Sequence, residues 1–188
     1  LPAQRQEMMA LEIGSAAPDF ALKDEHGQVT RLSDLRGDKH VALVFYPFAF
    51  SGICTGELCE LRDNIELFDA SGVQVLAVSC DPVHTLRAWQ EQQKYAFPLL
   101  SDFWPHGGTA QAYGVFNEAT GSAVRGTFLI DSTGVLRWSV VNGMGEARPL
   151  ACRLLRRGGV PTVEAAASWR EALEKAGGRP VVGIGNIK

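Results

Sequence analysis

"VALVFYPFAFSGICTGELCELRD" (residues 41–63) contains the strand-to-helix transition that decides the fold. Its first six residues are all apolar, which is typical of a strand covered on both faces. From Gly52 to Phe68, apolar residues recur three and four positions apart, which predicts a helix. The run "VQVLAVS", residues 73–79, predicts a second buried strand. These segments form one β-α-β unit, so we expect parallel strands joined by a right-handed crossover.

The other segments extend this alternation of strands and helices. Residues 20–35 alternate around Gly27, which predicts an N-terminal β-hairpin. Further along, the pattern predicts a helix over 84–95, a short helix over 109–115, strands over 126–130 and 135–141 with Gly134 in the turn between them, and a last helix over 163–176. We therefore expect an α/β protein with a central mixed β-sheet flanked by helices.

The composition is that of one ordinary globular domain. The chain has 188 residues, 46% of them hydrophobic, and a net charge of −3. Without a dominant basic run, the sequence does not favour nucleic acid or an anionic membrane as a partner. It shows neither an apolar run of about 20 residues nor a secretory signal, so we expect a cytoplasmic protein without membrane spans.

The four cysteines indicate redox chemistry rather than a structural framework. Cys54, Cys59, Cys80 and Cys152 are too few and too unevenly spaced for a disulfide scaffold. They include no close pair of the Cys-x2-Cys kind that zinc sites use, and the four histidines are scattered singly. We expect neither a metal nor another cofactor.

Cys54 lies where a helix is expected to begin, directly after a turn. Unpaired backbone N–H groups and the positive end of the helix dipole favour a thiolate at such a position. The alternative is a small buried apolar residue, which is a common environment for a free cysteine. Ser51 has two interpretations as well: a helix N-cap, or a hydroxyl that orients a thiolate and an incoming substrate oxygen.

The segment "PFAFSGIC", residues 47–54, resembles the Pro-x-x-x-Thr/Ser-x-x-Cys signature of the peroxiredoxins, and "VRGTFLID" resembles their arginine-bearing strand. The stretch "SDFWPHGGTAQAYGVFNEATG" is similar to the AhpE-type members. The resemblance implies a thioredoxin-like fold and an antioxidant peroxidase for hydrogen peroxide and organic hydroperoxides. It also implies that Cys54 attacks the peroxide, that Ser51 and Pro47 shape the pocket, and that Arg125 stabilises the thiolate.

Two further sets of side chains have both a functional and a structural interpretation. Arg125 carries a permanent charge and a planar fork that can bridge sulfur and oxygen, but it could equally be a surface arginine paired with Glu57. Phe48, Phe50 and Trp104 are candidates for the walls of the substrate pocket, although aromatic residues more often belong to a core.

Cys59 and Cys80 are candidates for the thiol that forms a disulfide with oxidised Cys54. Five residues along a helix separate two positions by about 7.5 Å along the axis and about 140° around it. A Cys54–Cys59 disulfide therefore requires the first helical turns to unwind, which Gly56 makes easier. The Cys-x4-Cys spacing resembles that of the peroxiredoxin Q group, where the second cysteine resolves the first. Cys80 and an external thiol remain alternatives.

The resemblance also sets expectations about partners and alternatives. The reductant is expected to be thioredoxin, a glutaredoxin-like protein or a low-molecular-weight thiol, and the assembly a homodimer. A thioredoxin-like disulfide oxidoreductase would need Cys-x-x-Cys, whereas Thr55, Gly56 and Glu57 follow Cys54. The other alternative is a redox-sensing or partner-binding protein of the same fold with little peroxidase turnover.

The ends of the chain depart from the family pattern. We expect residues 1–10 to be an N-terminal extension or a cloning remnant, and 11–176 to form the domain. Residues 147–163 are an atypical, insertion-like segment with a basic cluster. Residues 177–188 are rich in glycine, which is typical of a flexible tail.

Overall fold

The structure, a computed structural model, describes residues 11–70 and 72–142. The expected N-terminal extension, the insertion-like segment, the last helix, the glycine-rich tail and Cys152 all lie outside the described residues.

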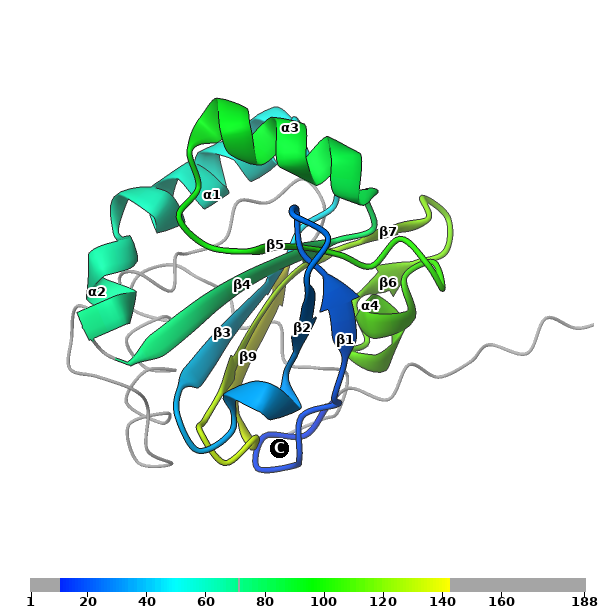
Figure 1. The fold of residues 1–188 in the computed structure, drawn as a ribbon. Coiled ribbons are helices and arrows are strands. Elements are labelled where there is room, and N and C mark those ends of the chain that lie inside the picture. Colours follow the sequence, from blue (N-terminus) through cyan, green and yellow to red (C-terminus); the bar gives the residue numbers. More distant parts are fainter. Residues whose placement is uncertain (1–10, 71, 143–188) are drawn as a thin grey trace, which may run out of the picture.

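The described part is built on a mixed seven-stranded sheet (Figure 1). Its strands are β1 (Ala21–Lys23), β2 (Val29–Arg31), β3 (His40–Phe45), β4 (Val73–Ser79), β5 (Leu99–Ser101), β8 (Arg125–Ile130) and β9 (Leu136–Asn142), in the order β2-β1-β5-β4-β3-β8-β9. The strands β3, β4 and β5 are parallel, whereas β8 pairs antiparallel with β3. The expected parallel β-α-β unit and the hairpin around Gly27 are confirmed.

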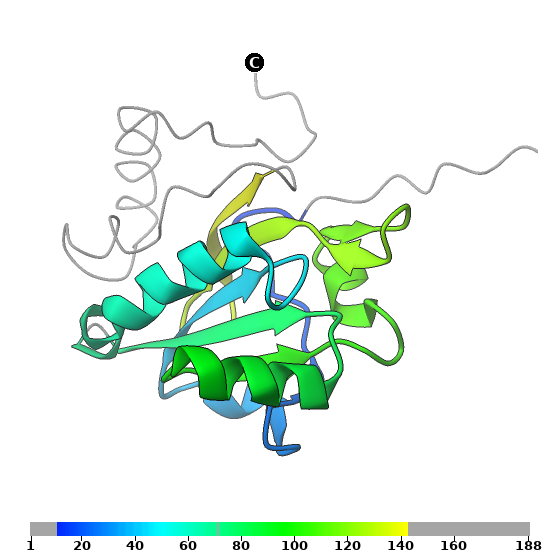
Figure 2. The ribbon, with the colours of Figure 1, turned by 90° about the horizontal axis from the view of Figure 1, so that it is seen from above.

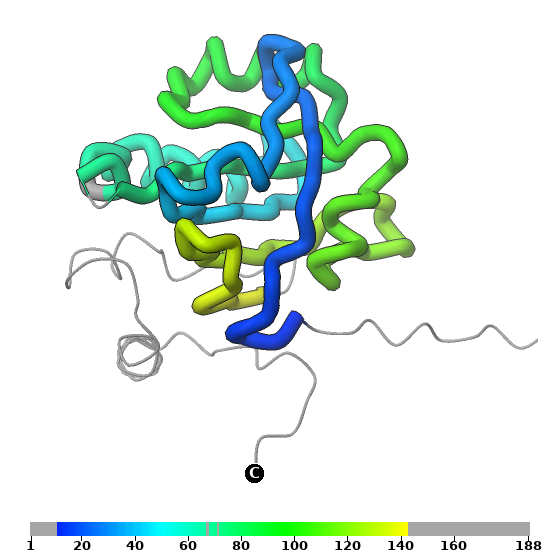
Figure 3. The backbone as a smooth tube through the Cα atoms, turned by 60° about the horizontal axis from the view of Figure 1, so that its bottom comes forward, coloured from blue at the N-terminus to red at the C-terminus, as the bar shows by residue number. Residues whose placement is uncertain are grey.

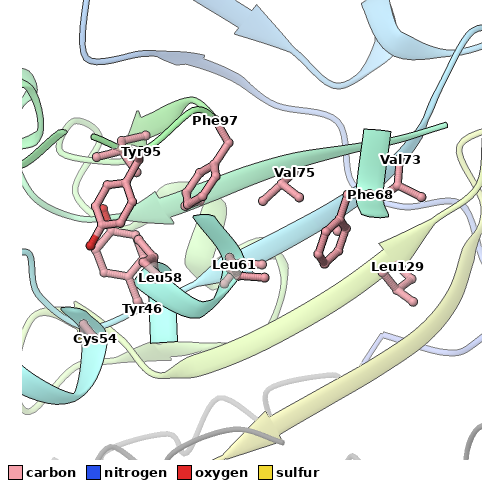
Figure 4. Close-up of a cluster of buried hydrophobic side chains, with 14 of the residues drawn as sticks. Tyr46, Cys54, Leu58, Leu61, Phe68, Val73, Val75, Tyr95, Phe97 and Leu129 are labelled. Atoms are coloured by element: carbon pink, nitrogen blue, oxygen red, sulfur yellow. The ribbon is translucent and has the colours of Figure 1, made fainter. Parts of the chain in front are cut away.

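Strand β3 supplies side chains to a separate core on each face of the sheet. Ala42 and Val44 belong to a buried cluster with residues of helices α1 (Gly52–Asp63) and α3 (Val83–Gln93). Figure 2 shows these two helices along one face, and Figure 4 shows part of the cluster beneath them. Leu43 and Phe45 point the other way, into a cluster that includes Ala110 of helix α4 (Gly108–Ala112). Both faces of β3 are therefore covered, which explains its continuous apolar run.

The prediction of a single helix over 52–68 is wrong, because two helices occupy this segment. Helix α1 ends at Asp63, and α2 (Ile65–Ala70) follows after Asn64. Asn64 has φ −119° and ψ 13°, outside the helical region. Its side-chain amide donates to the Glu60 carbonyl at 2.8 Å, which is the local competition with helical bonding that asparagine commonly offers.

No helix in the described ranges is long and apolar enough to cross a membrane.

Short elements that the apolar periodicity does not predict complete the fold. A 3-10 turn, η1 (Ser33–Leu35), precedes β3, and β6 (Phe116–Asn117) pairs with β7 (Ser122–Ala123) as a separate two-stranded sheet. The segment before β1 crosses beside the β8–β9 hairpin, as Figure 3 shows, where Ala16 forms a bridge with Val135.

The β8–β9 turn is fixed by one carboxylate. Asp131 accepts hydrogen bonds from the Thr133 hydroxyl at 2.6 Å and from Arg137 Nε at 2.5 Å, and Val135 N also donates to it at 3.0 Å. Burial alone would raise the pKa of Asp131, but these hydrogen bonds outweigh that effect and lower the pKa to about 2. Gly134 has φ +86°, as expected for this turn.

The Asp131→Asn variant should lower the free energy of unfolding at pH 7 by about 1 to 2 kcal/mol, a figure reduced for solvent screening. Because the folded pKa lies below the unfolded value of roughly 3.9, the stabilisation is present above that value and is lost as the pH falls through about 2. Urea unfolding should show that the difference from wild type halves, roughly, by pH 3. An equal difference at pH 7 and pH 3 would contradict this account; exposed Asp38→Asn is the control.

Candidate active site

The carboxyl ends of the parallel strands β3 and β4 place two loops side by side. Tyr46 continues β3 by donating its backbone N–H to the Val78 carbonyl at 3.0 Å. The carboxylate of Asp81, just beyond β4, accepts from Ala49 N at 2.8 Å and from the Ser79 hydroxyl at 2.7 Å. These bonds hold the loop over 47–51 against the neighbouring strand end. Pro47 is buried within that loop.

Cys54 lies in the first turn of α1, as the sequence predicts. Ser51 is the N-cap: its hydroxyl accepts from Cys54 N at 3.4 Å, and its carbonyl accepts from Thr55 N at 2.9 Å. The N-cap interpretation of Ser51 is therefore confirmed. The preceding residue, Phe50, has φ +63°, a conformation that costs a non-glycine residue about 1 kcal/mol or more. The local strain is sustained by the bonds that surround the loop.

Arg125 reaches the cysteine from β8. The antiparallel register pairs Phe45 with Gly126, so Arg125 lies one position beyond, beside the start of the Cys54-bearing loop. Its Nη2 donates to Cys54 Sγ at 3.4 Å, across 71 positions of sequence. Arg125 is 2% exposed and Cys54 0%, so the contact lies in the interior. The alternative of a surface arginine is wrong.

Glu57 completes the charge arrangement around Arg125. Its Oε2 forms an ion pair with Arg125 Nη1, and Glu57 itself is buried. Glu57 lies three residues after Cys54, which places both on the same side of α1. One guanidinium therefore contacts a carboxylate and a sulfur of the same helix. Because a buried charge that loses its partner is strongly destabilising, Glu57 also fixes where the Arg125 fork points.

The surroundings of Cys54 are aromatic and buried. Tyr46, Trp89 and Tyr95 share its buried cluster, and Figure 4 shows Tyr46 and Tyr95 near Leu58 above Cys54. Burial is the main cause that raises the pKa of Tyr46, with smaller contributions from the charges of Asp81 and Cys54. In such surroundings the Arg125 charge acts more strongly on the sulfur than it would in water.

The predicted pocket aromatics lie on the surface near this end of the sheet. Phe48 is 41% exposed, Phe50 49% and Trp104 83%. The Phe50 ring lies tilted beside the Trp89 ring, with centroids 6.0 Å apart. Phe48 and Phe50 follow β3, and Trp104 follows β5, so the three lie beyond the carboxyl ends of parallel strands. Phe103 belongs to the loop after β5, and Ile53 lies in the first turn of α1, directly after the loop over 47–51. Both are exposed and make the region strongly apolar.

The two candidates for the resolving cysteine have different environments. Cys54, Cys59 and Cys80 are all free thiols. Cys59 is half-buried on α1, and its sulfur lies 3.5 Å from Gln93 Oε1. Cys80 is buried after β4, where burial, followed by the charge of Asp102, raises the pKa of its thiol to about 12. Cys80 is therefore a poor nucleophile at neutral pH.

A buried thiol at a helix start, with a guanidinium directed at its sulfur, can attack an electrophile and stabilise the charge that develops on a leaving group. The profile of the AhpC/TSA family matches residues 13–139 of the chain. The chain belongs to this peroxiredoxin family. It is a thiol-dependent peroxidase, an oxidoreductase with an antioxidant function.

The relatives of this peroxiredoxin agree with that assignment. Alkyl hydroperoxide reductase E of Mycobacterium tuberculosis is 49% identical over 138 residues, which cover 73% of this chain and 90% of that protein. Peroxiredoxin-2 of Mus musculus is 38% identical over 157 residues, covering 77% and 78%.

Solved structures confirm the thioredoxin-like fold. Peroxidoxin BcpB from Mycobacterium tuberculosis has a TM-score of 0.68 and 29% identity, and covers 86% of this chain and 97% of its own. AhpC of Enterococcus faecalis has a TM-score of 0.71 and 29% identity, with coverage of 91% and 98%.

Two residues of the site escaped the sequence reasoning. The sequence suggests Glu57 only as a surface partner for Arg125. Its position one helical turn after Cys54 could have placed it inside the site. Asp81 is not among the site residues that the sequence predicts. The signal was its position directly beyond a buried parallel strand, at the sheet edge where the Cys54 loop also begins.

The Glu57→Gln variant should lower the free energy of unfolding by about 3 kcal/mol, because the Arg125 charge stays buried without its counterion. It should also slow oxidation of Cys54 by peroxide, because the guanidinium is no longer fixed. Urea unfolding and stopped-flow tryptophan fluorescence measure the two effects. Exposed Glu91→Gln is the matched control; a Glu57→Gln protein as stable and as reactive as that control would contradict the proposed arrangement.

Proposed function

We propose that Cys54 is the peroxidatic nucleophile of this enzyme and that it reduces hydrogen peroxide and organic hydroperoxides. The observation that carries the proposal is the 3.4 Å contact between Arg125 Nη2 and Cys54 Sγ at the start of α1. A thiolate there gains from the helix N-terminus and from the permanent charge of Arg125. The exposed aromatic residues Phe48, Phe50 and Trp104 supply apolar surface for the organic part of a hydroperoxide.

The reaction uses this geometry in one displacement. The Cys54 sulfur attacks one peroxide oxygen, the S–O bond forms, and the O–O bond breaks. The departing oxygen takes the electron pair and a proton and leaves as water or an alcohol, while Cys54 becomes a sulfenic acid. Arg125 can donate to both the sulfur and the departing oxygen, because its fork presents several N–H groups. Ser51 and Pro47 hold the loop that shapes the approach.

We propose that Cys59 then resolves the sulfenic acid. The thiol of Cys59 displaces the oxygen of Cys54, which leaves as water, and a Cys54–Cys59 disulfide forms. Cys80 is the weaker candidate because burial keeps its thiol protonated. Thioredoxin, a glutaredoxin-like protein or a low-molecular-weight thiol then reduces the disulfide by thiol–disulfide exchange. Such a supply of reducing thiols favours a cytoplasmic location.

We also propose that the enzyme is a homodimer that pairs through the apolar loops at the carboxyl edge of the sheet. Trp104 is 83% exposed, and Phe48, Phe50, Ile53 and Phe103 are each more than 40% exposed. Exposed apolar residues gathered in this way are typical of protein–protein contacts. Sedimentation velocity should find a dimer for the wild type and a monomer for Trp104→Glu; a monomeric wild type would contradict the proposal.

The Cys54→Ser variant should lose peroxidase turnover, because a serine hydroxyl cannot form the sulfenic acid. Peroxide consumption with reductant in excess measures the loss. Cys80→Ala, which removes a buried thiol outside the proposed chemistry, is the control and should retain turnover. Wild-type activity in Cys54→Ser would show that another group attacks the peroxide.

Treatment of the reduced enzyme with one equivalent of peroxide should produce a Cys54–Cys59 disulfide. Mass spectrometry of peptides alkylated before digestion identifies the linked pair. In Cys59→Ser, the same treatment should leave a sulfenic acid on Cys54, which a dimedone adduct reveals. A Cys54–Cys80 link, or a wild-type sulfenic acid that persists with Cys59 still alkylatable, would exclude Cys59 as the resolving thiol.

A further inference from the structure

Cys59 is held at the end of helix α3. Its sulfur lies 3.5 Å from Gln93 Oε1, a distance at which the thiol donates a hydrogen bond. Gln93 is the last residue of α3, 34 positions from Cys59. The side chain of the cysteine therefore connects two helices of the same face.

Arg62, one turn after Cys59, strengthens this connection. Its Nη1 donates to the Gln93 carbonyl at 2.6 Å. The carbonyls of a last helical turn lack intrahelical partners and carry the negative end of the helix dipole, so a guanidinium is well placed there. The two residues of α1 thus contact both the side chain and the backbone of Gln93.

Tyr95, two residues after Gln93, belongs to the buried cluster against which Cys59 packs. It is 2% exposed, and its hydroxyl makes no regular hydrogen bond with any described residue. Burial is the main cause that raises the pKa of Tyr95, and the neighbouring Cys59 sulfur raises it further. A buried hydroxyl without a better partner gains from remaining beside that sulfur.

The α3 end that carries Gln93 and Tyr95 is itself rigid. Lys94 adopts a left-handed conformation with φ +57° and donates its N–H to the Gln90 carbonyl at 2.7 Å. The Gln90 side-chain amide donates to the Tyr95 carbonyl at 3.0 Å. The tyrosine ring also packs edge-on against Trp89, with centroids 5.1 Å apart. Cys59 is therefore docked against a fixed surface.

We propose that Gln93 and Tyr95 form a latch on Cys59 which must open before the Cys54–Cys59 disulfide can form. The inference rests on the proposed resolving role of Cys59. In the intact helix the two cysteines are separated by about 7.5 Å along the axis and face different directions. Their β-carbons must come within about 4.5 Å for a disulfide. Cys59 must leave Gln93 and Tyr95 to make that approach.

The latch sets the competition between two fates of the Cys54 sulfenic acid. After the latch opens, the Cys59 sulfur bonds to the Cys54 sulfur, the S–O bond breaks, and the oxygen leaves as water with the thiol proton. While it stays closed, the site around Cys54 is intact and a second peroxide can oxidise the sulfenic acid to sulfinic acid. Gln93 and Tyr95 are positioning residues, because they act only through Cys59.

The test compares Gln93→Leu and Tyr95→Phe with wild type. Each variant removes one polar group and preserves the bulk of the side chain. If one variant fails to fold, the other still tests the proposal. Gln92→Leu, on the exposed side of the same helix, is the matched control. Stopped-flow fluorescence measures the peroxide step. Rapid alkylation followed by mass spectrometry measures formation of the Cys54–Cys59 disulfide after one equivalent of hydrogen peroxide.

Disulfide formation should be about threefold to tenfold faster in Gln93→Leu, the range expected from one lost hydrogen bond, and faster by a smaller factor in Tyr95→Phe, which removes only the buried hydroxyl. The peroxide step should match wild type in Gln93→Leu and Gln92→Leu, and Gln92→Leu should also form the disulfide at the wild-type rate. Sulfinic acid formed under excess peroxide should fall in the latch variants.

Two results would overturn the latch, and they are distinguishable. Equal rates of Cys54–Cys59 disulfide formation in wild type and both latch variants would overturn it and leave the resolving role of Cys59 in place. A wild-type enzyme that forms no Cys54–Cys59 disulfide would overturn both the resolving role and the latch.

Discussion

The buried guanidinium of Arg125 is the charge on which the arrangement of this site depends. A full charge at 2% exposure is costly unless it is paired, and Glu57 and the Cys54 sulfur pair it from one helix. The β3–β8 register brings Arg125 to the start of the Cys54 loop, and α1 brings Glu57 to the other side of the fork. The packed sheet and helix thus determine the electrostatics of the sulfur, and the proposed attack of Cys54 on peroxide requires such preorganisation.

The loop before α1 has a strained backbone that holds this geometry. Phe50 adopts a left-handed backbone, and Pro47 lies buried beside the end of β3. The Asp81 carboxylate holds the loop to the neighbouring strand end, and Ser51 caps the helix. Strain of this kind persists only where surrounding contacts over-determine it. The helix α1 that fixes Cys54 must unwind if Cys59 is to reach Cys54. The rigidity that favours the proposed attack on peroxide therefore opposes the motion that a Cys54–Cys59 disulfide needs.

Much of the architecture could be predicted from the sequence because its signals are local. The apolar runs of β3 and β4, the turn glycine Gly134 and the helix start at Cys54 each follow from short-range patterns. The break at Asn64 and the β6–β7 pair could not, because side-chain competition with the backbone and two-residue strands leave little periodicity. The spacing from Cys54 could place Glu57 on the same side of α1, but its pairing with the buried Arg125 of β8, 68 positions away, leaves no local pattern.

The oxidation rate of Arg125→Met as a function of pH tests the central claim most directly. Stopped-flow fluorescence should show oxidation about 100-fold slower than wild type at pH 7, the loss expected for one preorganised donor. The rate should remain well below wild type at a pH that ionises the thiol, because in the proposed mechanism Arg125 also stabilises the departing oxygen. The double variant Arg125→Met/Glu57→Gln removes the uncompensated carboxylate and should be slow as well. Recovery of the wild-type rate at high pH, or an unchanged rate at every pH, would contradict the claim.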